Sequence, residues 1–213
     1  MNNAVREVFP DATDVFAAPA EAGQALLPLA SIDLSHVDPE WTGTVHLVSP
    51  TVTDGYVGDG TEEFHTYTCR ANWIGFRLDE SNRYHFLADW RYFPDEPYDP
   101  THFEHRKALH RAHGALVETR WLDRQPLADL LARPLAVVES VGGTTPGWPN
   151  WAETDFPLAT DDEEDVHPLA EDGSRFHHVA TTVGWHWHPE GADRIVLFFE
   201  PVSRTALLTF DWS

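Results

Sequence analysis

The chain has 213 residues, of which 42% are hydrophobic, with nine Trp and twelve Phe. This apolar content is enough for a packed interior and excludes a globally disordered chain. The 35 acidic and 14 basic residues give a formal charge of −21, and such a field repels phosphate backbones, so nucleic-acid binding is disfavoured. No apolar run approaches the length of about 18 residues that a membrane helix needs. No secretory signal begins the chain, so we expect a cytoplasmic protein without membrane contact, folded as a single domain over residues 1–213.

The first half of the chain has the pattern of β structure after a weakly structured start. We expect a loose N-terminal arm over residues 1–21, where Ala, Pro and Asp are frequent. Apolar stretches at residues 26–34 and 44–49 predict the first two strands. Aromatic and polar residues alternate over residues 83–92, which predicts a strand that forms a hairpin with residues 73–78.

The rest of the chain predicts helices and then further antiparallel sheet. A helix is expected to start at Thr101, as the cap, with Glu104 in the reciprocal position, and to reach about residue 116. A shorter helix is expected at residues 127–132, between two prolines. Further segments are strands at residues 135–141, 176–187, 195–199 and 206–212, and a long loop over residues 142–174. This order of elements predicts an α+β fold dominated by antiparallel sheet.

An approximate internal repeat accounts for much of this pattern. Residues 28–50 are echoed by residues 178–201, with Ala30 matching Ala180 near the start of each copy. Each copy has a Pro-Glu pair in its turn and then an apolar strand that stops at a proline. We therefore predict a mostly antiparallel sheet built from two related half-repeats, approximately residues 22–134 and 135–213, with one or two central helices.

The segment GGTTPGWPNW, residues 142–151, precedes the second copy. Its two adjacent glycines permit positive φ and close approach of neighbouring backbone, and its two prolines stiffen the turn. Trp148 and Trp151 can then cover the seam between the two halves. We favour a role in anchoring the fold over a role in binding a ligand, because this segment has no titratable side chain before Glu153.

A strand that ends in Gly-Gly and is followed by Gly-Trp-Pro-x-Trp resembles the YwqG-like family of uncharacterised bacterial proteins. In that family an apolar-Gln-Ile-Asp strand, a polar turn and a Leu-Tyr-Phe-Phe strand occur once in each half. LASIDL followed by TVHLVS is similar to the first copy, and HVATTV followed by RIVLFFEP is similar to the second. Ser31 and Thr181 replace the usual Gln, Asp33 has no acidic counterpart in the second copy, and the cysteine pairs of some relatives are missing. The resemblance implies a duplicated α+β fold and no activity.

Thirteen histidines invite the hypothesis of a metal site. Four of them form two i, i+3 pairs on the expected central helix: His102, His105, His110 and His113. Each pair would need further ligands, so packing or surface roles are favoured. His186 and His188 would share one face of the strand expected at residues 176–187, and they could bind a divalent metal together with a carboxylate. We favour the alternative in which the neighbouring tryptophans are buried and both histidines face solvent.

Nucleophilic catalysis has little support in the sequence. The single cysteine, Cys69, excludes an internal disulfide and a cysteine-based zinc site. Cys69 could form a reactive pair with His65, which would lie on the same strand face. A buried, small apolar role is favoured for a cysteine inside an alternating strand. No Gly-x-Ser-x-Gly elbow or phosphate-binding loop occurs, and we assign no catalytic residue, metal ligand or cofactor.

The strongest electrostatic feature is a run of five acidic residues: Asp161, Asp162, Glu163, Glu164 and Asp165. Adjacent like charges must be solvated or neutralised by a partner or a cation, and a flexible solvated loop is the favoured structure. The functional alternative is a docking segment for a surface rich in Arg and Lys, with Trp148 and Trp151 beside it.

We therefore expect a non-enzymatic, cytoplasmic protein-binding domain, of the kind in which an acidic immunity protein neutralises a basic partner or toxin. The alternative is a metal-binding protein or metal-dependent enzyme that uses one of the histidine clusters. A third possibility is a structural protein that self-associates through exposed aromatic side chains.

Overall fold

The chain is described by a computed structural model over residues 3–51, 57–94, 98–119, 122–145, 150–161, 165–189 and 191–212. Its strands are β1 Val5–Val8, β2 Leu26–Asp33, β3 Thr44–Pro50, β4 Trp73–Leu78, β5 Tyr84–Phe86, β6 Ser140–Val141, β7 Leu158–Thr160, β8 Val166–Pro168, β9 His177–Thr182, β10 Arg194–Glu200 and β11 Thr205–Asp211. Its α-helices are α1 Ala12–Val15, α2 Pro19–Ala25, α3 Thr101–His113 and α4 Leu127–Leu131. Its 3-10 turns are η1 Leu34–His36, η2 Glu62–Phe64, η3 Trp90–Tyr92, η4 Asn150–Glu153 and η5 Gly184–His186. Helices combined with antiparallel sheets confirm the predicted α+β class.

The N-terminal part of the chain forms a three-stranded sheet in the order β1, β2, β3. Every residue of β2 is buried, as its continuous apolar run predicts. The loose arm that we expected over residues 1–21 is wrong for the residues that the structure describes. β1 pairs antiparallel with β2, and the side chains of Ala4 and Phe16 are each 1% exposed in the core. Burial of these apolar side chains offsets the entropy lost on ordering the segment.

A six-stranded antiparallel sheet forms the centre of the molecule, in the order β5, β4, β11, β10, β9, β6. β10 and β11 form the expected hairpin, in which Arg194 pairs with Asp211 at one end and Glu200 with Thr205 at the other. β4 lies at the predicted residues and pairs with both β11 and β5. The sheet therefore takes β4 and β5 from the first predicted half and its other strands from the second.

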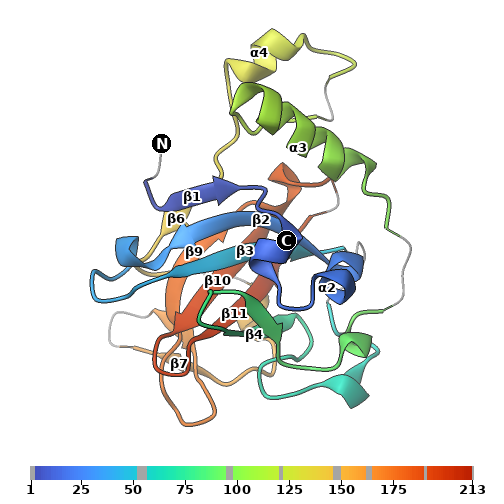
Figure 1. Ribbon diagram of the computed structural model, residues 1–213. Helices are drawn as coiled ribbons and strands as arrows, with labels where there is room; N and C mark the ends of the chain where they lie inside the picture. The colour runs from blue at the N-terminus through green and yellow to red at the C-terminus, as the bar shows by residue number, and fades with distance from the viewer. Residues whose placement is uncertain are drawn as a thin grey trace.

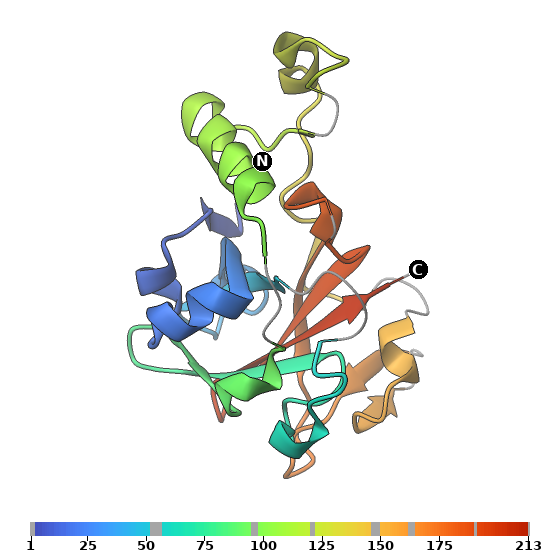
Figure 2. The same cartoon turned by 90° about the vertical axis from the view of Figure 1, so that its right-hand side faces the viewer.

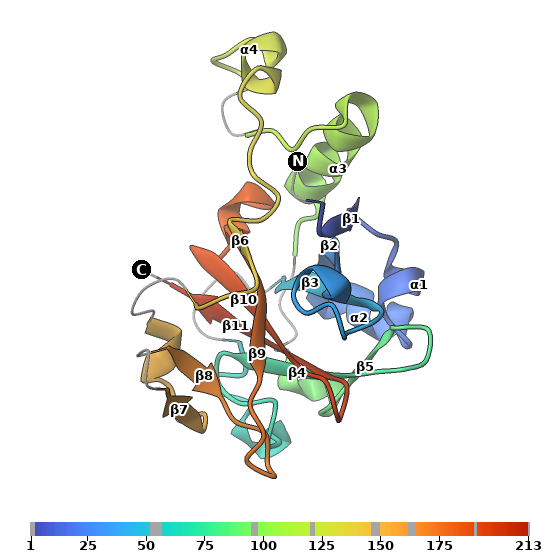
Figure 3. The same ribbon diagram turned by 90° about the vertical axis from the view of Figure 1, so that its left-hand side faces the viewer.

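β10 shows that the six-stranded sheet is covered on both faces. Ile195, Leu197 and Phe199 belong to the core that also contains β2 and β3. The intervening Val196 and Phe198 belong to a second apolar cluster on the other face. Figure 3 shows β2 and β3 on one side of this sheet and β7 and β8 on the opposite side. Because both faces are buried, β10 is apolar at nearly every position and does not alternate with polar residues.

The two copies of the sequence repeat fold as the same hairpin. The first copy is β2, η1 and β3, and the second is β9, η5 and β10. Ala30 pairs with Leu47 in the first copy, and Ala180 pairs with Leu197 in the second. Both residues of the second pair lie 150 positions after the corresponding residues of the first. A one-residue bulge precedes this pair in both copies, at Leu29 in the first and at Val179 in the second. Bulges are specific features of a strand pair, so the shared register and bulge relate the two hairpins more closely than their sequences do.

Helices α3 and α4 lie together at one end of the molecule, beyond the sheets, as Figure 1 and Figure 2 show. The guanidinium of Arg106, on α3, is buried and donates to Thr119 Oγ1, to the Trp185 carbonyl and to Glu118 Oε1. This bonding fixes α3 to the turn that contains η5. Within the described residues, none of the helices combines the length and apolarity needed to cross a lipid bilayer.

Several predicted boundaries are wrong because local hydrogen bonding ends or starts an element. The cap of α3 is not Thr101: the Asp99 carboxylate accepts from the Thr101 backbone N–H at 3.0 Å and from its hydroxyl at 2.6 Å. The Asp89 carboxylate accepts from the Arg91 backbone N–H and starts η3, so the strand expected over residues 83–92 is only β5. The strands expected at residues 135–141 and 176–187 shorten to β6 and β9, and η4, β7 and β8 occupy the expected long loop.

Candidate functional site

A cleft of about 350 Å³ lies where the two repeats meet, and we name it the inter-repeat cleft. The turn after β2 contributes Val37, Asp38 and Trp41. The second half contributes Gly143 and Thr144 from the glycine motif, Asp161 and Asp165 from the acidic run, and Arg175, His177 and His178 around the start of β9. The structure thus brings together the glycine motif, the acidic run and one histidine pair, which the sequence could only indicate separately.

Arg175 binds two carboxylates of the acidic run. Its guanidinium lies 3.0 Å from Asp161 Oδ2 and 2.7 Å from Asp165 Oδ2. The other oxygen of Asp165 accepts from the backbone N–H and the hydroxyl of Thr145, each at 3.1 Å. The flexible solvated loop that we favoured is therefore wrong for Asp161 and Asp165, which close the β7–β8 hairpin. Asp162, Glu163 and Glu164 lie outside the described residues.

Trp41 and His177 form an aromatic wall of the inter-repeat cleft. Their ring centroids are 5.2 Å apart in an edge-to-face arrangement, and Trp41 is partly exposed. Burial, together with the nearby charge of Arg175, lowers the pKa of His177. Burial also lowers the pKa of His178, whose Nδ1 lies 3.0 Å from the Gly142 carbonyl. Both imidazoles are therefore neutral at pH 7, and the cleft has three carboxylates against the single guanidinium of Arg175.

Trp151 of the glycine motif lies in a buried aromatic cluster and not at the surface. Trp151 is 1% exposed and packs edge-to-face on Trp73 and Phe198, with ring centroids 5.5 Å away in both cases. This cluster covers the face of the six-stranded sheet that points away from β2 and β3. Trp73 belongs to the first predicted half and Phe198 to the second, so Trp151 contacts both halves, as predicted, but its buried ring offers no surface to a partner. Trp148 lies outside the described residues.

One group of side chains could supply three ligands to a metal ion. Ligand atoms of Asp161, Asp165 and His167 all lie within 4.8 Å of one another. Carboxylate oxygen and imidazole nitrogen suit several divalent ions. Arg175 binds the same two carboxylates, however, and its positive charge opposes the approach of a cation.

The histidines that sequence analysis singled out lie elsewhere. His102, His105 and His113 are exposed on α3, and His110 packs against Phe9. His186 and His188 are both buried, so the prediction that they face solvent is wrong. The reason is that residues 184–186 form a 3-10 turn, which lacks the alternation of a strand. His186 Nδ1 lies 3.0 Å from the Ala136 carbonyl, and His188 Nε2 lies 3.0 Å from Ser49 Oγ.

Cys69 has the features of a core residue. Its side chain is fully buried, and burial raises the pKa of its thiol to about 11. Its sulfur lies 3.3 Å from the Gly75 backbone nitrogen, which donates to it. His65 Nε2 instead bonds to the Gly58 carbonyl. A protonated, enclosed thiol is a poor nucleophile at neutral pH.

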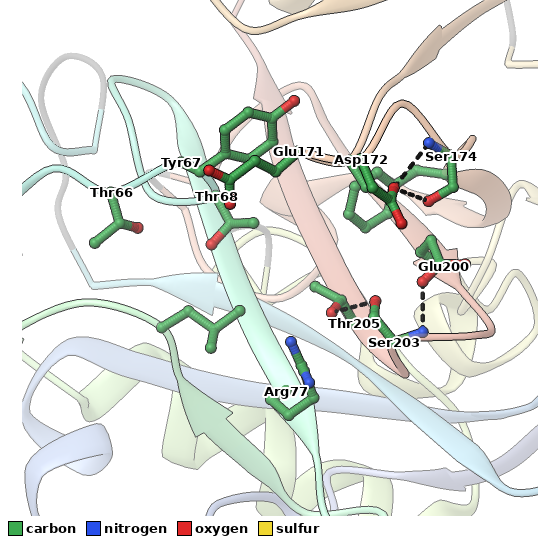
Figure 4. A pocket seen from close by; sticks show the side chains of 13 residues that line it. Thr66, Tyr67, Thr68, Arg77, Glu171, Asp172, Ser174, Glu200, Ser203 and Thr205 are labelled. Atoms are coloured by element: carbon green, nitrogen blue, oxygen red, sulfur yellow. Dashed lines mark hydrogen bonds between the residues drawn. The ribbon is translucent and has the colours of Figure 1, made fainter.

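Six of the thirteen side chains that line a second cleft, of about 460 Å³, carry a hydroxyl group, and we name it the hydroxyl cleft. Figure 4 shows Ser203 and Thr205 near Arg77, with Tyr67, Thr68, Glu171 and Asp172 farther from it. Glu200 is 3% exposed and accepts from the backbone N–H groups of Val202 and Ser203, so it fixes the β10–β11 turn. Three carboxylates and one guanidinium line this cleft as well.

Two pairs of a hydroxyl and an imidazole were not predicted from the sequence. Ser31 Oγ lies 2.9 Å from His46 Nδ1, and Thr181 Oγ1 lies 2.9 Å from His178 Nε2. Ser31 and Thr181 are equivalent positions of the repeat, 150 residues apart. A signal was present in the sequence, because Ser31 and Thr181 occupy the same position in the two copies of the repeat. The histidine partners come from non-equivalent positions, which the alignment of the copies could not indicate.

Comparison of the chain with protein-family models, with curated proteins and with solved structures found no match. The resemblance to the YwqG-like family stays a prediction.

Proposed function

We propose that the chain is an acidic binding domain for a basic protein partner, in the manner of an immunity protein that neutralises a basic toxin. In this proposal the inter-repeat cleft receives an arginine or lysine side chain of the partner. The formal charge of −21 would speed encounter with such a partner and make association sensitive to salt.

The observation that carries the proposal is the lining of the inter-repeat cleft. It already binds one guanidinium, that of Arg175, through Asp161 and Asp165. Asp38 lies in the same cleft, and its Oδ1 accepts only the local bond from the Glu40 backbone N–H among the described residues. Trp41, partly exposed beside it, offers an aromatic face to a cation. A carboxylate next to an aromatic ring is a suitable environment for a second guanidinium.

The test uses a peptide of consecutive arginines as the probe and titration calorimetry as the readout. We expect binding that weakens steeply as ionic strength rises, because the attraction is between exposed charges. Asp38→Asn should weaken binding about fivefold, which corresponds to about 1 kcal/mol. Glu80→Gln makes the same change in net charge at an exposed residue that lines neither the inter-repeat nor the hydroxyl cleft, and it serves as the matched control.

Two results would contradict the proposal. Binding that ignores ionic strength would mean that charge does not drive it. Equal weakening by Asp38→Asn and Glu80→Gln would mean that the overall field binds the peptide and that the inter-repeat cleft has no part in it.

The second candidate function is binding of a divalent metal by Asp161, Asp165 and His167, whose ligand atoms converge. Because Arg175 holds the same carboxylates, Arg175→Met should raise the affinity for the metal if this function is correct. Elemental analysis of protein purified without a histidine tag checks it, and metal below a stoichiometric amount in both forms would exclude it. Self-association through exposed aromatic side chains has little support. Among the described residues, the large hydrophobic side chain that is exposed belongs to Val202, which is not aromatic.

A further inference from the structure

Ser31 and His46 face each other across the β2–β3 pair of the first repeat. They are register partners, and Ser31 Oγ lies 2.9 Å from His46 Nδ1. The other ring nitrogen, Nε2, lies 3.1 Å from the Asn82 carbonyl oxygen. A carbonyl oxygen can only accept, so Nε2 carries the proton and Nδ1 is left to accept from the Ser31 hydroxyl. A hydroxyl, a base and a group that orients the base are thus in line, which is the arrangement of an activated nucleophile.

The protonation state of His46 fits the role of a base. Burial lowers the pKa of His46 to about 4, against the opposing effects of the Asn82 carbonyl and the charge of Asp14. The ring is therefore neutral at pH 7 and can take a proton. Asp14 lines the same cleft as His46, so its carboxylate favours the imidazolium that forms.

The second repeat has the same hydrogen bonds, but its hydroxyl is closed off from solvent. His178 Nδ1 lies 3.0 Å from the Gly142 carbonyl, and its Nε2 accepts from the Thr181 hydroxyl. Thr181 is 0% exposed, so no reactant can reach its hydroxyl. Ser31 and His46 each retain 5% exposure and line a cleft of about 400 Å³. We name this space the Ser31 cleft; the structural difference between the two pairs is the access that it provides.

Two further groups that line the Ser31 cleft could stabilise negative charge on a reacting oxygen. Arg6 is bound to Asp33 through Nε and Nη2, and the rest of its half-exposed guanidinium faces solvent. Asn82 also lines the cleft. Its Oδ1 accepts from Arg204, whereas its Nδ2 makes no hydrogen bond to another described residue. Hydrogen-bond donors beside a nucleophile are what acyl transfer requires.

We propose that Ser31 is the nucleophile, and His46 the general base, of a site that hydrolyses small carboxylic esters. Ser31 Oγ attacks the ester carbonyl carbon while its proton passes to His46 Nδ1. The bond from that carbon to the alkoxide breaks, and the alkoxide takes the proton from Nδ1 and leaves as the alcohol. Water then attacks the acylated Ser31, gives a proton to Nδ1, and releases the carboxylic acid as the proton returns to Ser31 Oγ. The reaction involves no redox change and needs no further reactant.

The first test is covalent labelling with a fluorophosphonate, a probe that reacts with activated serine hydroxyls. The full chain is labelled and then digested, and the labelled residues are located by mass spectrometry of the peptides. We expect one label, on Ser31, in the folded protein and none in protein unfolded in urea. Absence of labelling, or labelling of Ser49 or another serine in place of Ser31, would overturn the proposal. This readout needs no variant and so does not depend on the folding of one.

The second test is turnover of p-nitrophenyl acetate. The low basicity of His46 makes its imidazolium costly, so we expect slow turnover, well below the typical enzyme rate of about 10 per second. Ser31→Ala should lower this rate about a hundredfold or to that of buffer. Thr181→Ala removes the equivalent hydroxyl of the second repeat, leaves the same kind of unpartnered imidazole, and should keep the wild-type rate. Equal rates in Ser31→Ala and wild-type protein would refute the proposal.

Discussion

The first and second repeat hairpins have the same register, the same bulge and the same 3-10 turn, yet they close their turns differently. Leu34 and Trp41 of the first turn correspond to Gly184 and Gly191 of the second, 150 residues later. A Cβ added to Gly184 would lie 2.4 Å from the Ala192 carbonyl oxygen, and one added to Gly191 would lie 2.4 Å from the Gly184 carbonyl carbon. The second turn is therefore closed backbone against backbone, whereas side chains fill the first.

This difference follows from the place of each hairpin in the fold and indicates where binding can occur. The second hairpin is central in the six-stranded sheet, and both its faces are covered. The first belongs to the smaller sheet, and its open turn places Trp41 and Asp38 in the inter-repeat cleft. Its Ser31 also reaches a cleft, while Thr181 of the second hairpin is sealed. The second hairpin also lines the inter-repeat cleft, through His177 and His178, so the two copies differ in the access to their hydroxyl–imidazole pairs.

Acid should cause the largest change in stability, and it acts on both hairpins. Burial lowers the pKa of His46 and of His188 to about 4, from 6.5. Between these values the unfolded chain binds protons that the folded chain does not, so stability falls as pH falls from 6.5 towards 4. Each histidine contributes about 3 kcal/mol over this window. Urea unfolding at pH 7.5 and at pH steps down to 4.5 measures the loss.

Variants separate the contribution of the first hairpin from that of the rest. His46→Gln should remove about 3 kcal/mol of the pH dependence, because the titrating group is gone. His102→Gln is the control, since His102 is exposed on α3 in the folded state. A wild-type protein whose urea midpoint is constant from pH 7.5 to 4.5 would show that the buried histidines do not titrate as stated.

The close backbone packing that glycine permits in the second turn should make the next largest contribution to the free energy of unfolding. Gly184→Ala forces its new methyl against backbone atoms of Ala192, and because backbone cannot move aside as a side chain can, we expect a loss of about 3 kcal/mol. Gly23→Ala is the matched control, because its Cβ would meet no atom within 4 Å on the exposed face of α2. That change should stabilise the chain by about 0.5 to 1 kcal/mol. Equal effects of the two substitutions on the urea midpoint would show that the close approach is not present in solution.

Much of the fold was predictable because local pattern and burial agree. β4 and α4 lie close to the expected residues, as does the β10–β11 hairpin, since each has the apolar run or proline boundary of its element. Predictions failed where the carboxylate of a single side chain accepts a hydrogen bond from a nearby backbone N–H. Asp89 converts an alternating stretch into a 3-10 turn, and Asp99 binds Thr101, so that α3 begins at Thr101 with Pro100 at its N-cap. Such carboxylate–amide bonds leave no periodic signal.

The candidate site was less predictable, because its geometry depends on contacts distant in the chain. The acidic run was visible, but nothing in the sequence placed Arg175 between Asp161 and Asp165. The glycine motif was visible too, yet Trp151 packs on the far face of the sheet because η4 turns it towards Trp73. His46 acquires Ser31 as a partner only through the β2–β3 register, and Asn82 is 36 residues away.

The smallest expected effect concerns Asp33, an acid that the first hairpin has and that Val183 replaces in the second. Asp33 Oδ1 accepts from the backbone N–H and the hydroxyl of Ser35, at 3.0 and 2.8 Å, and so starts η1. Its Oδ2 accepts from Arg6 at 2.9 and 2.7 Å, and these bonds to Arg6 hold the pKa of Asp33 at about 2. The carboxylate is therefore ionised at pH 7 and serves as both a cap and an ion-pair partner.

Two substitutions of Asp33 separate these roles. Asp33→Ala removes both and should cost about 1 to 2 kcal/mol at pH 7. Asp33→Asn keeps an oxygen for the Ser35 N–H and loses only the ion pair, whose Arg6 side chain is 56% exposed, so it should cost about 0.5 kcal/mol. High salt should erase the effect of Asp33→Asn and leave most of the effect of Asp33→Ala, because screening acts on the ion pair and not on the cap. Equal urea midpoints for the two variants would mean that the ion pair, and not the cap, stabilises the first turn.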